Sequence, residues 1–193
     1  MGIEYELKYR ATASQLAQLR QAFAGEEARF TMQTTYYDTP TQQLSARHYT
    51  LRCRRENDRY VCTVKAPAQG LGRGEWETEG GDILDAIPVL CKLGAPETLQ
   101  GLVAEGLIPI CGASFTRITK QIVQPDFTAE LALDTGKLTG GGRELPLCEA
   151  ELELKSGDAE EMTAYARQLA ALYGLKPEHR SKFRRAMKLY KGE

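Results

Sequence analysis

Charged and apolar residues alternate strictly at the start of this chain. In MGIEYELKYR, Glu4, Glu6 and Lys8 are separated by single apolar or aromatic residues. Successive side chains of a β-strand point to opposite faces, so this spacing predicts a strand with one charged face and one buried face. The same spacing recurs along the chain, and a fold for this sequence has to accommodate a whole set of two-faced strands.

The recurring alternation predicts eight strands in two groups. After the opening strand they are RFTMQTTYYD, the hairpin strands TLRCRRE and RYVCTVKAP, RGEWETE, SFTRITKQIV, FTAELALDTGKL and ELPLCEAELELKSG. Helical spacing of apolar residues predicts a helix at 13–23, a helical insertion at about 82–105 and C-terminal helices at about 158–190. We therefore expect an α+β fold dominated by antiparallel sheet, in a single domain over residues 1–193.

The charges on the predicted strands are sorted by sign. Acids dominate the first, fifth and last strands, whereas bases dominate the third, fourth and sixth. An open sheet with its charged face in solvent remains an alternative, although a solvated face does not require acids and bases to be on separate strands. An eight-stranded sheet can instead close into a barrel, which removes its edges. If helices covered the apolar outer face, the charges would line a polar lumen.

A lumen that carries both signs predicts a ligand chemistry. Unpaired buried charges cost several kcal/mol each, so they need compensating ions. Arginine and lysine suit phosphate oxygens. Clustered carboxylates suit a hard divalent cation such as Mg²⁺ or Mn²⁺. Together these residues predict a pocket for a metal-bound polyphosphate.

Composition argues against several other classes. The formal net charge of -1 provides no basic field for nucleic acid. No segment approaches the ~18 consecutive apolar residues of a membrane span, and no signal-peptide pattern opens the chain, so we expect a cytoplasmic protein. The five cysteines show no CxxC spacing, which argues against a zinc site or a disulfide framework.

Ordered motifs along almost the whole chain resemble those of a known family. EYELK is similar to the ExExK signature of the CYTH domain, the triphosphate tunnel metalloenzymes. The further matches are YYDTP, LRCRRE, TVK, RGEWE, LALDTG, CEAELELKSGD and the SK pair followed by Arg185. ExExK alone is a weak signal, because any amphipathic strand can show it. The closing segment, from ALDTGKL through CEAELELKSGD to the SK pair, resembles most the bacterial inorganic triphosphatases.

The resemblance implies an eight-stranded antiparallel β-barrel that forms a tunnel. It also implies metal-dependent hydrolysis of inorganic triphosphate to diphosphate and phosphate, with Mg²⁺ or Mn²⁺. The expected metal ligands are Glu4, Glu6, Glu75, Glu77, Asp134, Glu151 and Glu153. The expected phosphate contacts are Lys8, Arg52, Arg54, Lys65, Arg73, Arg117, Lys182 and Arg185. By resemblance, Lys65 and Tyr36 form a catalytic pair.

Two positions depart from the family pattern. Phe115 stands where many members have a lysine, and Ala132 where many have an acid. The alternatives that stay open are a thiamine or nucleoside triphosphatase, a class IV-type adenylate cyclase and a non-catalytic polyphosphate-binding module. The expected partner is a small triphosphate, with no nucleic acid and no membrane. The oligomeric state is left open, with a homodimer as one option.

Overall fold

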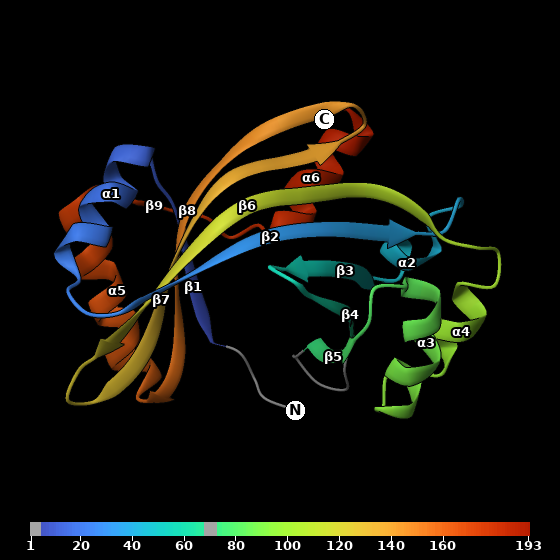
Figure 1. Ribbon diagram of the computed structural model, residues 1–193, viewed down its shortest axis with the longest axis horizontal. Helices are drawn as coiled ribbons and strands as arrows, with labels where there is room; N and C mark the ends of the chain where they lie inside the picture. Colours follow the sequence, from blue (N-terminus) through green and yellow to red (C-terminus); the bar gives the residue numbers. More distant parts are fainter. Residues whose placement is uncertain (1–4, 68–72) are drawn as a thin grey trace.

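A computed structural model of the protein describes residues 5–67 and 73–193. The described residues form nine strands and six helices (Figure 1). The strands are β1 (Glu6–Arg10), β2 (Glu27–Asp38), β3 (Thr50–Glu56), β4 (Arg59–Pro67), β5 (Arg73–Glu79), β6 (Ile108–Val123), β7 (Phe127–Gly140), β8 (Arg143–Gly157) and β9 (Lys176–Pro177). The helices are α1 (Ala13–Ala22), α2 (Gln43–Ala46), α3 (Ile83–Lys92), α4 (Thr98–Leu102), α5 (Ala159–Tyr173) and α6 (Lys182–Lys191).

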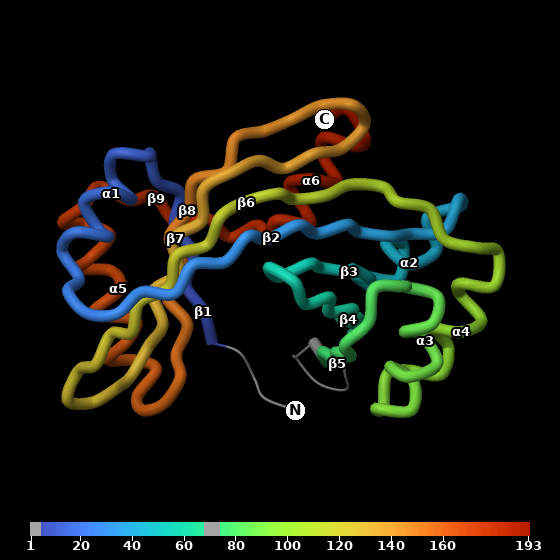
Figure 2. The backbone as a smooth tube through the Cα atoms, viewed as in Figure 1, coloured from blue at the N-terminus to red at the C-terminus, as the bar shows by residue number. Residues whose placement is uncertain are grey.

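All strands belong to one antiparallel sheet. Its order is β5-β4-β3-β2-β6-β7-β8-β1-β9. The tube in Figure 2 shows that the sheet is strongly curved, with β2 and β6 running along the length of the molecule. The predicted α+β antiparallel fold is confirmed. The structure adds the two-residue strand β9, which is too short to leave a periodic signal in the sequence.

The predicted helical segments are confirmed, with differences at their boundaries. The insertion contains α3 and α4, and the C-terminal part contains α5 and α6. Within the segment at about 158–190, the second helix, α6, begins at Lys182. Ser181 caps this helix, because its hydroxyl accepts a hydrogen bond from the amide of Arg184 at 3.1 Å. The cap fixes the first turn of α6 and therefore the place of Lys182.

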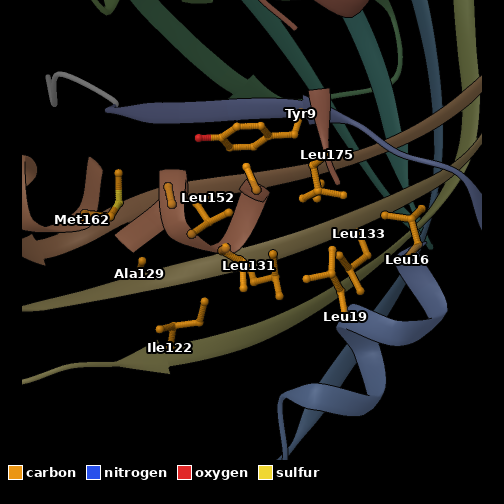
Figure 3. Close-up of a cluster of buried hydrophobic side chains, with 14 of the residues drawn as sticks. Tyr9, Leu16, Leu19, Ile122, Ala129, Leu131, Leu133, Leu152, Met162 and Leu175 are labelled. Atoms are coloured by element: carbon orange, nitrogen blue, oxygen red, sulfur yellow. The ribbon is translucent and has the colours of Figure 1, made fainter. Parts of the chain in front are cut away.

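Helices α1 and α5 cover the outer face of β1, β7 and β8. In Figure 3, Leu16 and Leu19 of α1 lie next to Leu131 and Leu133 of β7, and all four are buried. Burying an aliphatic side chain of this size contributes roughly 1.5–3 kcal/mol. The apolar residues of these strands thus point to the outer face of the sheet, where helices cover them, as the alternation predicts.

A second apolar cluster covers the outer face of β3 and β4. Leu51 and Val64 of the strands pack with Ile87 and Leu90 of α3. Because neighbouring residues on a strand face opposite sides, Arg52 and Arg54 of β3 point to the inner face. Because both apolar clusters lie on the outer face, the charged residues of the strands lie on the concave face of the sheet.

Helix α6 lies on the inner face of the sheet, at one end. Its Ala186 and Met187 pack against Leu138 of β7 and Leu147 of β8. A Cβ atom added to Gly140 of β7 would lie 2.5 Å from the carbonyl oxygen of Ala186, so only glycine allows this close approach. Helix α6 fills this end of the concave face and brings its first turn next to the charged residues. No helix in residues 5–67 and 73–193 is long and apolar enough to cross a membrane.

Candidate functional site

A cavity of about 540 Å³ lies against the inner face of the sheet. Strands β1 to β8 and the start of α6 all contribute side chains to it. Such a volume lies within the range of small-molecule sites. The lining residues are Glu6, Lys8, Tyr36, Thr50, Arg52, Arg54, Thr63, Lys65, Glu75, Phe115, Arg117, Glu130, Ala132, Glu151, Glu153, Ser181, Lys182 and Phe183.

One side of the cavity is the arginine wall, which we define as Arg52 and Arg54 of β3 with Lys65 of β4. Cross-strand register places Glu75 of β5 opposite Lys65, and the Lys65 Nζ lies 2.6 Å from the Glu75 Oε2. The ion pairs of Arg52 are longer. Its Nη2 lies 3.5 Å from one carboxylate oxygen of Glu75 and 3.5 Å from one of Glu77. The two arginines are therefore held only loosely by acids.

The donors of the arginine wall are not all used within the protein. The Nε of Arg52 is buried and has no hydrogen-bond partner among the described residues. Arg54 reaches Glu56 at 3.3 Å and donates to the Thr34 hydroxyl at 3.3 Å. Burial lowers the pKa of Arg54, and the neighbouring charges of Arg52 and Arg117 lower it further. This concentration of positive charge favours the binding of an anion.

The opposite side is the carboxylate wall, which we define as Asp134 of β7 with Glu149 and Glu151 of β8. One carboxylate oxygen from each lies within 4.8 Å of the others. Arg117 of β6 donates to both oxygens of Asp134, from Nε at 2.8 Å and from Nη2 at 2.7 Å, and also to Glu151. The bidentate geometry is typical of strong arginine–carboxylate pairs.

Helix α6 supplies further cations to the carboxylate wall. The Lys182 Nζ lies 2.8 Å from Asp134 Oδ2 and 2.8 Å from Glu151 Oε1, and it also contacts Glu149. Arg185, one turn later in α6, pairs with Glu149. The three acids thus face three basic side chains, and the cluster is compensated without any ligand.

The pKa values of Glu149 and Glu151, on β8, are shifted in opposite directions. Burial raises the pKa of Glu149 above its ordinary value, against the pull of Lys182. Burial would also raise the pKa of Glu151, but Lys182 and Arg117 outweigh it and hold that pKa below the ordinary value. For Lys182, burial opposes the charge, while Glu151 and Asp134 prevail and raise its pKa. Glu151 and Lys182 are therefore both charged at neutral pH.

A third group of acids lies at the rim of the cavity. The sheet register aligns Glu6 of β1 with Glu153 of β8, and Glu153 with Glu130 of β7. Lys8 lies 2.7 Å from Glu6, and Lys155 lies 2.9 Å from Glu153 and 3.6 Å from Glu130. About a third of each of these carboxylate side chains is exposed. Such oxygens are accessible to a hydrated divalent cation.

Aromatic rings form part of the cavity lining. Tyr36 of β2 and Phe183 of α6 have ring centroids 5.0 Å apart. Phe115 of β6 lies on the same inner face, and two cations approach its ring, Lys182 at 5.2 Å and Arg117 at 5.8 Å from the centroid. The cavity therefore combines both signs of charge with an apolar surface.

The structure brings most of the predicted site residues into this cavity. Asp134 and Arg185 lie instead in the buried ion-pair cluster, and Glu77 binds Thr63 at 2.8 Å beside Arg52. Glu4 and the side chain of Arg73 lie outside the part of the chain that the structure describes. The predicted residues that line the cavity are Glu6, Lys8, Tyr36, Arg52, Arg54, Lys65, Glu75, Arg117, Glu151, Glu153 and Lys182.

Several residues of the site were not among the predicted ligands. Glu149 and Glu130 have the same strand parity as the predicted acids of β8 and β7, so the alternation places them on the charged face without assigning them a role. The same holds for Thr63 on β4. Phe183 has no such signal, because its place depends on where α6 begins and how that helix packs on the sheet.

The CYTH domain family profile matches residues 2–187 of this chain. The inorganic triphosphatase of Haemophilus influenzae is 30% identical over 139 residues, which cover 70% of this chain and 39% of that relative. The match thus spans less than half of the relative's length.

Solved structures show the same fold. A Hippeastrum protein, described as a candidate adenylyl cyclase with a dominant triphosphatase activity, has a TM-score of 0.68 at 16% identity, covering 99% of this chain and 97% of that one. A candidate adenylate cyclase from Bacillus halodurans has a TM-score of 0.61 at 22% identity, covering 95% and 96%.

Proposed function

Because this chain belongs to the CYTH domain family, we propose that it is a metal-dependent triphosphatase that hydrolyses inorganic triphosphate to diphosphate and phosphate in the cavity described above. One observation carries the proposal. Arg52 and Arg54 face the cavity side by side, with ion pairs no shorter than 3.3 Å and a buried Nε of Arg52 that lacks a partner among the described residues. The inorganic triphosphatase among the relatives supports the choice of substrate.

A chain of phosphate groups matches the donors of the cavity. Arginine binds two phosphate oxygens at once, and lysine acts as a point charge. Arg52, Arg54 and Lys65 would bind one end of the substrate, whereas Arg117 and Lys182 approach it from the opposite wall. Bound phosphate oxygens would replace the long contacts that Arg52 makes with Glu75 and Glu77.

The rim carboxylates fit the proposed metal ion. Oxygen ligands from several acids are what Mg²⁺ and Mn²⁺ require, and Glu6 and Glu153 offer partly exposed oxygens on neighbouring strands. We propose these two as the principal ligands, with Glu151 next to them. A bound divalent cation would neutralise the triphosphate and acidify a bound water. Asp134, Glu75 and Glu77 stay predicted ligands, and each of them already contacts a basic side chain.

The predicted catalytic pair also lines the cavity. Both residues pair with β3: Tyr36 of β2 is opposite Arg52, and Lys65 of β4 is opposite Thr50, two residues earlier on that strand. The Nζ of Lys65 forms an ion pair with Glu75 at 2.6 Å. We propose that its ammonium group stabilises negative charge on the phosphate that leaves.

The first test is an activity assay. Phosphate release is measured from inorganic triphosphate, ATP and thiamine triphosphate, each with Mg²⁺, Mn²⁺ or EDTA. We expect rapid release from inorganic triphosphate that EDTA abolishes. In Glu6→Gln the rate should fall by about 100-fold or more, because one metal ligand loses its charge. The matched control is Glu144→Gln, an exposed acid of β8 that pairs with Lys137 and does not line the cavity.

Two results of this assay would contradict the proposal in different ways. Equal rates for Glu6→Gln and the native protein would remove Glu6 from the metal site but leave the activity in place. If none of the three compounds released phosphate although inorganic triphosphate bound, the protein would be either a cyclase, which releases diphosphate rather than phosphate from ATP, or a polyphosphate-binding module. Product analysis with ATP separates these two.

The aromatic side chains of the cavity favour a second candidate, an organic triphosphate such as ATP or thiamine triphosphate. Tyr36, Phe115 and Phe183 line the same cavity as the cations, and a ring system of a substrate can pack on such side chains. A kcat/KM for ATP that exceeds the value for inorganic triphosphate would establish this candidate. Analysis of the product then separates hydrolysis from cyclisation to cyclic AMP.

A further inference from the structure

Phe115 lies where the apolar cluster beneath α6 meets the charged residues of the cavity. It lies on the charged inner face of β6, two residues before Arg117, and 5% of it is exposed. Its ring lies 5.2 Å from the Lys182 Nζ and 5.8 Å from the Arg117 guanidinium carbon. Cations within about 6 Å of an aromatic centroid are attracted by the negative face of the ring.

We propose that Phe115 is a positioning residue, which holds Arg117 and Lys182 at the cavity wall through the contacts of these two cations with its ring. The role in substrate binding rests on the proposed triphosphatase function, whereas the ring contacts themselves do not.

The electrostatic environment explains why a ring is useful at this position. Arg117 and Lys182 repel each other, yet both bind the same two acids, Asp134 and Glu151. A further cation at residue 115 would add to that repulsion, whereas an aliphatic side chain would give no attraction. An aromatic ring attracts both cations and leaves the pairing with the acids intact.

The backbone next to Phe115 is adapted to it. Gly136 of β7 is the cross-strand partner of Phe115. A Cβ atom on Gly136 would lie 2.5 Å from the Cα and 2.6 Å from the Cβ of Phe115. Any larger residue at 136 would displace the strand at this point. The sheet thus fixes the base of the Phe115 side chain, and the ring has a defined position from which to hold the two cations.

Stepwise fluorination of the ring tests the proposal. Fluorine withdraws electrons and weakens the attraction for cations while it changes the shape of the ring little. We introduce mono-, di- and trifluorophenylalanine at 115 and measure the affinity for inorganic triphosphate by calorimetry in EDTA. The Kd should rise with each fluorine, to about tenfold for the trifluoro ring, and Phe115→Leu should reach a similar value. The same substitutions at Phe127, which packs against Tyr165 at 5.5 Å, are the control and should leave the Kd within twofold.

A loss of affinity in Phe115→Leu without any trend along the fluorine series would overturn the proposal, since it would mean that only shape matters. Unchanged affinity in all variants would overturn it as well.

A second measurement does not depend on triphosphate. Unfolding equilibria are compared for native protein, Phe115→Leu, Lys182→Met and the double variant. If the ring attracts Lys182, the effects are coupled, and the unfolding constant of the double variant should differ at least threefold from the product of the single effects. Independent effects would overturn the ring contact. If native protein fails to bind triphosphate while the coupling is present, the proposed function fails and the positioning of Lys182 stands.

Discussion

The two walls of the cavity use similar residues in different ways. In the carboxylate wall, Asp134 and Glu149 are fully buried, and short ion pairs join the acids to Arg117, Lys182 and Arg185. In the arginine wall, the acids that approach Arg52 and Arg54 stay at 3.3–3.5 Å.

This difference separates a structural role from a binding role. The carboxylate wall pairs its three acids with three cations and ties α6 to the sheet, although Arg117 and Lys182 also face the cavity. In the arginine wall, the long contacts of Arg52 and its unpartnered Nε leave donors for a ligand. Substitutions in the first wall should therefore affect stability most, and substitutions in the second should affect affinity most.

The largest expected effect is on stability, in Lys182→Met. Removal of this ammonium leaves three buried carboxylates with two cations, and loss of one partner from a buried ion pair destabilises by about 3–5 kcal/mol. The free energy of unfolding in urea measures this. Lys188→Met, on the exposed side of α6, is the control and should change it by less than about 0.5 kcal/mol. Equal stability of the two variants would contradict a structural role for the wall.

The next effect is on affinity, in Arg52→Ala. A hydrogen bond to a charged group contributes about 1.5–3 kcal/mol, which corresponds to a Kd for inorganic triphosphate roughly 10- to 150-fold higher. Stability should change little, because the carboxylate contacts of Arg52 are long and Arg54 loses a like charge beside it. Calorimetry in EDTA gives the Kd, and Arg55→Ala on the same strand is the control. A fall in stability with unchanged Kd would reverse the roles of the walls.

The pH dependence of stability tests the carboxylate wall without changing its cations. The pKa of Glu151 in the folded protein lies below its ordinary value near 4.5. A lowered folded pKa adds stability above pH 4.5, and this stability is lost as the pH falls from 4.5 toward the folded pKa. At pH 3 the loss from one such group is about 2 kcal/mol. Urea unfolding at pH 7 and pH 3 should show a smaller loss in Glu151→Gln than in native protein, and an unchanged loss in Glu144→Gln. Equal losses in all three proteins would contradict the ion pairs of Glu151.

The alternation of the sequence was sufficient to predict which face of each strand is charged. Arg52 and Glu151 point inward because their neighbours in the chain are buried under helices, and Glu6 follows the same alternation next to the partly buried Leu7. The face to which a side chain points depends only on its place in its own strand, because successive side chains of a strand alternate between the two faces. This alternation also places Glu149 and Glu130 on the charged face, but it does not say what either acid contacts.

The group that each inward-facing side chain contacts could not be predicted in the same way. Whether an inward acid faces a metal or a base depends on sheet register and on where α6 lies. Asp134 and Glu153 have similar sequence signals, yet one is buried against Arg117 and Lys182, and the other is at the rim beside Lys155. Glycines at 136 and 140 allow close approaches that no periodicity indicates. These tertiary contacts decide the difference between the walls.

The smallest expected effect concerns the rim, in Lys155→Met. Lys155 lies 2.9 Å from Glu153 and 3.6 Å from Glu130, and 43% of its side chain is exposed. Such exposed pairs contribute about 0–1 kcal/mol, so the free energy of unfolding should hardly change. The affinity for Mn²⁺, followed by titration calorimetry, should instead rise by about two- to threefold, because the rim acids lose a competing cation. Lys137→Met, which removes the partner of Glu144 at 2.5 Å, is the matched control and should leave Mn²⁺ binding unchanged. Unchanged Mn²⁺ affinity in Lys155→Met would move the metal away from Glu153, toward acids such as Glu75 that lie beside the arginine wall.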